Sequence, residues 1–180
     1  MSIKQVRLWL PLIVIMVMSI FLWKNLHSNL HIISSPLIDK QLPTLAAERL
    51  LHPTQQVTNR DFIGHVSLLN VFATWCSSCR LEHSVMMDIH QAHQVKIFGL
   101  NYKDSRWQAT QWLAKYGNPY TKVIYDPIGR IGINLGVYGT PETFLIDQQG
   151  IVRYKYVGPL TKIGWQETLL PIVKKLINGA

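Results

Sequence analysis

The chain has only two cysteines, Cys76 and Cys79, and two serines separate them. They directly follow the apolar segment 66–74, and the segment 80–93 after them has a helical pattern. A sulfur at a helix N-terminus is stabilised as a thiolate by free backbone N–H groups and by the helix dipole. We therefore predict that Cys76 is the attacking sulfur in thiol–disulfide exchange and that Cys79, one turn later, resolves the mixed disulfide.

Two other uses of the cysteine pair compete with exchange chemistry. A structural disulfide is disfavoured, because closing so short a ring removes only about 2 kcal/mol of unfolded-state entropy. A zinc site of Cys76, Cys79, His90 and His93 has a suitable set of ligands. Its spacings are slightly short, however, and a small zinc finger does not begin with a long buried strand. Redox chemistry is the favoured interpretation.

A second segment that can take part in such chemistry is Thr140-Pro141, which follows Gly139 and precedes an apolar run beginning at Thr143. A proline before a strand is often a plain strand-entry residue. A Thr-Pro bond in a glycine-flanked turn is equally compatible with a cis peptide bond, which leaves the preceding backbone free to pair with an extended peptide. The sequence leaves both interpretations open.

The elements that must position these residues alternate between strand and helix. This order predicts an α/β fold, a layered sheet with helices on both faces. Hydrophobic periodicity predicts strands at 66–74, 95–102 and 121–125, helices at 80–93, 106–116 and 130–135, a hairpin of 143–147 and 151–157, and a closing helix at 165–177.

The N-terminal part of the chain predicts a membrane anchor. Sixteen uncharged residues run from Leu8 to Trp23, which as a helix span about 24 Å against about 30 Å of hydrocarbon. No small-residue cleavage site follows, so an uncleaved transmembrane helix is favoured over a signal peptide. Lys4 and Arg7 outnumber Lys24 on the far flank, which places the N-terminus in the cytoplasm and the rest of the chain outside it.

The expected organisation is an anchor at residues 1–24, a linker at residues 25–36 and one folded domain at residues 37–180. Residues 25–53 are expected to form a polar spacer that enters this domain, with Pro36, Pro43 and Pro53 as breakers of regular structure. The formal net charge of +8 comes from scattered Lys and Arg residues, with no basic run longer than Lys174-Lys175. Nucleic-acid binding is therefore not expected.

Two motifs together resemble those of the thioredoxin superfamily. They are Trp75-Cys-x-x-Cys79 after a buried strand and Thr140-Pro141 before a later strand, and the resemblance covers about residues 37–178. More closely, the chain is similar to the membrane-tethered thiol:disulfide interchange proteins of cytochrome c maturation, the CcmG/DsbE type. The similar runs are 68–76, 79–83 and 136–144.

This resemblance implies a thioredoxin-like fold and a periplasmic reductant held at the inner membrane. The implied client is apocytochrome c, whose haem-attachment cysteines are kept reduced directly or through a haem-lyase subunit. A membrane thiol reductant of the DsbD or CcdA kind is implied as the electron donor, and no cofactor is expected. Trp75, Thr140 and Pro141 are expected to line the substrate groove.

Asn70 occupies the position, six residues before Cys76, where general thioredoxins carry a buried acid. Because Asn cannot accept the proton of Cys79, another carboxylate is expected to do so. Glu82 lies three residues after Cys79 on the same helical face, and Glu142 follows the Thr-Pro pair. For Glu82 a solvated helix charge is an equally good interpretation.

Two alternative functions stay open. One is a general or ResA-like thiol reductant with another client. The other is a copper-binding chaperone in which Cys76, Cys79 and a histidine are the ligands. Copper chaperones of this fold usually have a distal ligand histidine, whereas no histidine follows His93 in this chain.

Overall fold

The computed structural model describes residues 3–26 and 36–179, which belong to two separate units, residues 1–30 and residues 31–180. The first unit contains the helix α1 (Ile3–Leu26), which covers the predicted anchor segment. No helix within the described ranges combines the length and the apolar character needed to cross a membrane. Most of the predicted linker, residues 25–36, lies outside the described residues.

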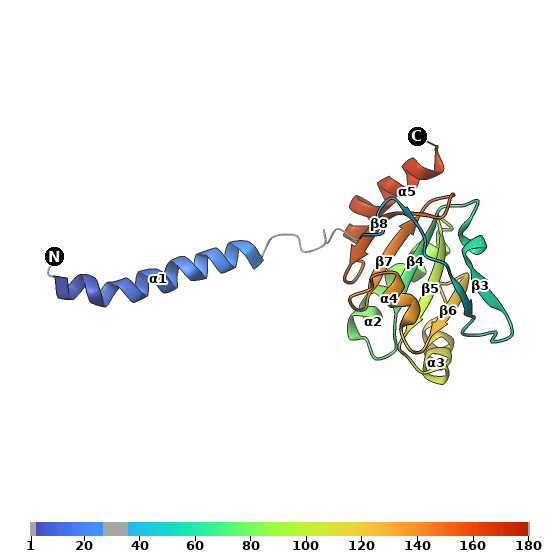
Figure 1. The fold of residues 1–180 in the computed structure, drawn as a ribbon, viewed down its shortest axis with the longest axis horizontal. Helices are drawn as coiled ribbons and strands as arrows, with labels where there is room; N and C mark the ends of the chain where they lie inside the picture. The colour runs from blue at the N-terminus through green and yellow to red at the C-terminus, as the bar shows by residue number, and fades with distance from the viewer. Residues whose placement is uncertain (1–2, 27–35, 180) are drawn as a thin grey trace. The chain divides into compact units, whose positions relative to one another are not determined.

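The second unit is built around one mixed β-sheet (Figure 1). Its six strands are β1 (Lys40–Gln41), β4 (Ser67–Phe72), β5 (Lys96–Tyr102), β6 (Lys122–Asp126), β7 (Glu142–Ile146) and β8 (Ile151–Val157). Their order across the sheet is β1-β8-β7-β4-β5-β6. The strands β4, β5 and β6 run parallel, whereas β7 is antiparallel to β4 and to β8, and β1 is antiparallel to β8.

The central strand β4 is buried along its whole length, as expected for a strand covered on both faces. Its side chains alternate, so that Leu68 and Phe72 join one hydrophobic cluster and Leu69 and Val71 join the other. The first cluster packs α2 (Ser77–Gln91), α3 (Arg106–Tyr116), the π-helix η2 (Gly164–Leu169) and α5 (Leu170–Ile177) against the sheet. The second includes residues of α4 (Arg130–Asn134) and the 3₁₀-helix η1 (Asn59–Phe62). The predicted sheet with helices on both faces is confirmed.

The predicted elements differ from the observed ones in two instructive places. The helix α2 begins at Ser77 instead of residue 80, so Cys76 is its N-cap. The expected polar spacer is wrong at residues 40–41, which form β1, and at residues 46–48, which form β2 (Ala46–Glu48). The strand β2 pairs with β3 (Gln56–Thr58) in a small separate hairpin. These strands are too short to show a hydrophobic period, and distant strands supply part of their pairing.

The segment 39–50, which we call the N-terminal strap, runs from one edge of the main sheet to the other. Lys40 and Gln41 pair with β8 at the first edge. At the opposite edge Arg49 forms a β-bridge with Ile124 of β6, and the Leu50 N–H donates to the Val123 carbonyl at 2.8 Å. Two side chains between these ends, Leu42 and Leu45, are buried in the second hydrophobic cluster.

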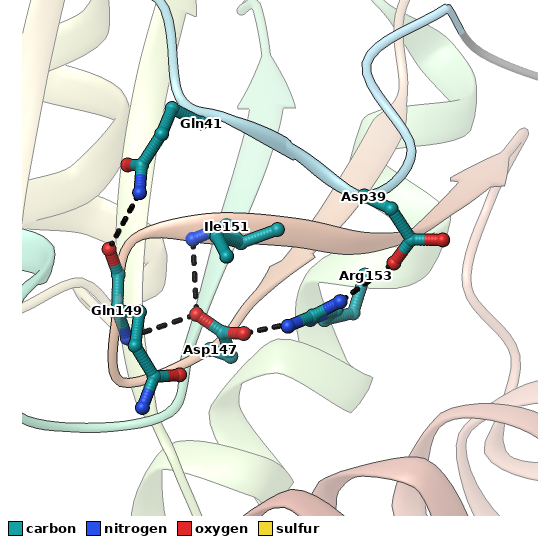
Figure 2. Close-up of polar contacts among 6 residues, drawn as sticks. All are labelled: Asp39, Gln41, Asp147, Gln149, Ile151 and Arg153. Atoms are coloured by element: carbon teal, nitrogen blue, oxygen red, sulfur yellow. Dashed lines mark hydrogen bonds and ion pairs between the residues drawn. The ribbon is translucent and has the colours of Figure 1, made fainter.

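Polar contacts hold the beginning of the strap against the β7–β8 hairpin, as Figure 2 shows. The Asp147 carboxylate accepts hydrogen bonds at 2.9 Å from the N–H groups of Gln149 and Ile151, which shapes the turn between the two strands. Arg153 of β8 then bridges Asp147 at 2.6 Å and Asp39 at 2.7 Å (Figure 2). The same guanidinium therefore ties the turn to the strap.

Candidate active site

The two cysteines are joined in a disulfide at the N-terminus of α2, with an Sγ–Sγ distance of 2.12 Å. Cys76 is the N-cap residue, and its sulfur accepts a hydrogen bond from the Cys79 N–H at 3.0 Å. Cys76 is 7% exposed, whereas Cys79 is 2% exposed. Both cysteines are therefore buried, and Cys76, the residue at the helix N-terminus, is slightly more exposed than Cys79.

The turn that carries the cysteines is fixed by a neighbouring loop. The Asp104 carboxylate accepts hydrogen bonds from the Thr74 N–H at 2.6 Å and from the Thr74 hydroxyl at 2.7 Å. The Trp75 indole N–H donates to the Lys103 carbonyl at 2.9 Å. Sequence reasoning missed Asp104. Its position just after β5 could have indicated this contact, because the loops that follow neighbouring parallel strands lie at the same end of a sheet.

The Thr140-Pro141 peptide bond is cis, which decides between the two interpretations of this segment. It comes immediately before β7, and Glu142 at the start of β7 is paired with Val71 near the end of the antiparallel strand β4. Thr140-Pro141 and the cysteine turn therefore lie at the same end of the sheet. Trp75 lies there too, with 59% of its surface exposed.

Glu82 is buried beneath the cysteine turn, with only 2% of its surface exposed. Its carboxylate accepts hydrogen bonds from the Asn70 side-chain amide at 2.9 Å and from the Leu160 N–H at 2.8 Å. Burial raises the pKa of Glu82 to about 7, although both hydrogen bonds act in the opposite direction. The interpretation of Glu82 as a solvated helix charge is wrong.

Asn70 connects Glu82 to a second buried group, Tyr120. The Tyr120 hydroxyl donates to the side-chain oxygen Oδ1 of Asn70 at 2.8 Å. Burial, together with the nearby Glu82, raises the pKa of Tyr120 well above its usual value. Gly99 makes room for this ring, because a Cβ there would lie 3.0 Å from it. Tyr120 lies 50 residues from Asn70 in sequence, and no local pattern predicts their contact.

Glu142 lies on the other face of the sheet. It is paired with Val71 across β4 and β7, whereas Asn70, which contacts Glu82, is paired with Thr143. Successive side chains of a strand point to opposite faces, so Glu142 shares the face of Val71 and not that of Asn70. The structure therefore does not bring the two predicted acids together.

The partner of Glu142 is Lys155 of β8, a residue that the sequence did not suggest. Their ion pair is 3.0 Å long, and both side chains are almost fully buried. Glu142 also accepts a hydrogen bond from the Tyr138 N–H at 3.1 Å, and the Lys155 ammonium donates to the Gly136 carbonyl at 2.7 Å. The Lys155 nitrogen lies 4.1 Å from the centroid of the Tyr138 ring. This pair thus anchors the turn that leads to Thr140-Pro141.

The ligand sets considered for metals are not assembled in the structure. Among the described residues no group of three or more His, Cys, Asp or Glu side chains is arranged to hold a metal ion. The rings of His90 and His93 lie 6.2 Å apart, near the C-terminal end of α2, whereas the two cysteines lie at its N-terminal end. The residues of the considered zinc set therefore lie at opposite ends of α2.

Comparison with known proteins agrees with this geometry. Residues 38–168 match the redoxin family. The thiol:disulfide interchange protein DsbE of Allochromatium vinosum is 42% identical over 179 residues, which cover 99% of either chain. The DsbE protein of Escherichia coli is 39% identical over 184 residues, which cover 98% of either chain. The chain belongs to the redoxin family, with relatives of the DsbE type.

A solved structure shows the same architecture for this redoxin. The secreted thiol-disulfide isomerase of Corynebacterium glutamicum superposes with a TM-score of 0.69 at 26% identity, covering 82% of this chain and 94% of that one. The fold is therefore thioredoxin-like. With its Cys76–Cys79 disulfide, the redoxin is a thiol:disulfide oxidoreductase.

Proposed function

We propose that this redoxin is a periplasmic reductant of protein disulfides in cytochrome c maturation, with apocytochrome c or its haem-lyase subunit as client. The similarity to DsbE proteins extends over nearly the whole chain, and this supports a shared role. The observation that carries the chemistry is the arrangement of an N-cap sulfur on Cys76, a second sulfur on Cys79 and the buried acid Glu82 along one helix.

The reaction starts from the reduced pair and transfers two electrons. The Cys76 thiolate attacks one sulfur of the client disulfide, and the other client sulfur leaves as a thiolate that takes up a proton. The Cys79 thiolate then attacks the Cys76 sulfur, which forms the Cys76–Cys79 disulfide of the structure and releases the second client thiolate. Net, two electrons and two protons pass to the client.

Glu82 serves this reaction as the proton acceptor for Cys79. The thiol of Cys79 must lose its proton before it attacks, and its burial disfavours the charged thiolate. Because burial raises the pKa of Glu82 to about 7, this carboxylate takes up and returns a proton near neutral pH. Asn70 and the Leu160 N–H hold the carboxylate in place.

The N-terminal segment holds the domain at the membrane, where the dithiol is also regenerated. The uncharged segment from Leu8 to Trp23, with Lys4 and Arg7 before it, supports a single-pass tether in the inner membrane with a cytoplasmic N-terminus. A catalytic domain outside the cytoplasm needs a dedicated electron source. A membrane thiol reductant of the DsbD or CcdA kind supplies two electrons and two protons to restore the dithiol.

A peptide containing an oxidised Cys-x-x-Cys-His sequence tests the chemistry. The reduced wild-type protein should convert it to the dithiol, and the Cys79→Ser variant should accumulate a mixed disulfide that mass spectrometry detects. The Cys76→Ser variant is the matched control and should form no such adduct. A peptide that stays oxidised with the wild-type protein would contradict the reductase function.

Trapping in cell envelopes tests the client. The Cys79→Ser variant, with its N-terminal segment intact, should carry apocytochrome c or a haem-lyase subunit in disulfide linkage, and the Cys76→Ser variant should not. Adducts with unrelated envelope proteins alone would favour a general or ResA-like reductant.

A further inference from the structure

A groove beside the cysteine turn is lined by aromatic and basic side chains. It lies between α2 and α3, has a volume of about 360 Å³, and we call it the α2–α3 groove. Its aromatic and basic lining residues are Trp75, Arg80, Trp107, Trp112, Lys115 and Tyr116. Since Thr74 and Trp75, which directly precede Cys76, line the groove, one end of it lies beside the cysteine turn.

The floor of the groove is buried and its rim is exposed. Trp112 is buried, with its ring 4.3 Å from that of His83 and 5.6 Å from that of Tyr116. On the rim, Trp107 is 71% exposed and Trp75 is 59% exposed, and exposed apolar side chains that gather in one patch mark interaction sites. Aromatic side chains around a preformed hollow are typical of the anchoring points of protein interfaces.

The charge of the groove is positive. Arg80 and Lys115 both lie near the Tyr116 ring, with Cζ and Nζ 6.0 Å and 5.2 Å from its centroid. Within the described part of the chain neither of them forms an ion pair, and the lining contains no carboxylate. Arg106 on the same helix is instead paired with Glu48. The two groove cations are thus available to an acidic partner.

The shape of the groove suits an extended chain. From Trp107 to Lys115 the helix α3 rises about 12 Å, which an extended segment of about four residues spans. Gln108 and Gln111 on the same helix line the groove as well, and their amides suit the backbone of such a segment.

We propose that the α2–α3 groove binds an acidic segment of the protein whose disulfide Cys76 attacks. The segment lies beside Lys115 and Arg80, packs an apolar or aromatic side chain against Trp107 and Trp112, and thereby brings the neighbouring disulfide to Cys76. The inference rests on the proposed reductase function. It adds that the protein prefers client disulfides that are flanked by acidic residues.

The test uses two oxidised Cys-x-x-Cys peptides that differ only in four flanking residues, which are acidic in one and uncharged in the other. The measured quantity is the ratio of their reduction rates. For the wild-type protein at low salt the acidic peptide should react on the order of tenfold faster, as electrostatic steering produces. The ratio should approach one at 1 M salt, where charges are screened beyond about 3 Å.

The deciding variants are Lys115→Glu and its control Lys174→Glu, which changes the net charge equally on the exposed face of α5. Lys115→Glu should abolish or invert the ratio, Lys115→Gln should lower it about threefold, and Lys174→Glu should leave it near the wild-type value. Because each variant is compared with itself on the neutral peptide, a general loss of folding does not imitate this result.

Each other outcome overturns the inference in a distinguishable way. Equal rates for both peptides with the wild-type protein leave the reductase function standing and overturn the groove. Equal effects of Lys115→Glu and Lys174→Glu show a response to overall charge and overturn it as well. If neither peptide is reduced, the proposed function fails and the inference falls with it.

Discussion

Glu82 and Glu142 are both buried carboxylates close to the active-site end of the sheet, but their surroundings differ. Glu142 has a lysine 3.0 Å away, and this pair anchors a turn on one face of the sheet. Glu82, on the other face, accepts hydrogen bonds from Asn70 and Leu160, and among the described residues no cation is paired with it. The first arrangement balances a charge, whereas the second leaves a group that gains a proton near neutral pH.

The comparison separates an acid that is paired with a cation from one that has only neutral partners. A buried ion pair adds little to stability by itself, but losing one member is costly because the other charge stays buried. A buried carboxylate with neutral partners instead makes the free energy of unfolding depend on pH, because the folded and unfolded states bind its proton with different affinity. The four predictions below test this distinction.

The largest effect is expected from Lys155→Met. Removing the ammonium leaves Glu142 buried without its counter-charge, so the free energy of unfolding should fall by about 3–5 kcal/mol. Urea denaturation of the oxidised protein measures this loss. The double variant with Glu142→Leu should recover most of it, and a double variant as unstable as the single one would show that Lys155 acts through packing alone.

The second effect is a pH dependence of stability that Glu82 causes. Its pKa is about 7 when folded against a usual value of 4.5, so between these values the folded protein binds more protons than the unfolded chain. The stabilisation is fully present below about pH 4.5 and is lost as the pH rises through 7. For the wild-type protein, this loss lowers the free energy of unfolding by an amount on the order of 3 kcal/mol.

Urea denaturation at pH 5 and pH 8 measures this term as the difference between the wild-type protein and Glu82→Gln, both in the oxidised form so that the cysteines do not titrate. The exposed Glu167→Gln variant is the control and should retain the full wild-type dependence. An equal pH dependence in Glu82→Gln and wild type would assign the titration to another group.

A smaller effect is expected from Tyr120→Phe. The change removes the hydroxyl that donates to the buried Asn70 side chain and leaves one acceptor without its partner. The free energy of unfolding should fall by about 1–2 kcal/mol. Tyr138→Phe is a matched control because its ring is exposed. Equal losses in both variants would argue against a specific role of the Tyr120 hydrogen bond.

The smallest effect concerns the thiols of the reduced protein. Glu82→Gln should lower the pKa of the cysteine pair, because a negative charge one helical turn from Cys79 is removed. Glu142→Gln should leave the thiol titration unchanged, since that residue lies on the other face. Absorbance of the thiolates measures both curves, and a shift of similar size in both variants would contradict the separation.

Much of this architecture follows from local sequence. The alternation of apolar segments predicts α3 and β8 to the residue, and the helix after the cysteine pair places Glu82 on the same side as Cys79. The burial of Glu82 could not be predicted from local sequence, because one of its hydrogen-bond donors, the Leu160 N–H, lies 78 residues away. Likewise Lys155 meets Glu142 only through the pairing of β7 with β8.

The N-terminal strap covers parts of both edges of the main sheet, which bears on aggregation. An uncovered sheet edge offers a row of free N–H and C=O groups on which another chain can build, and this is a common route to aggregation. Here Lys40 and Gln41 cover part of β8, and Arg49 and Leu50 pair with β6, so one short segment partly closes both edges. Because Arg153 pins the start of that segment, a surface ion pair helps to keep the edge at β8 covered.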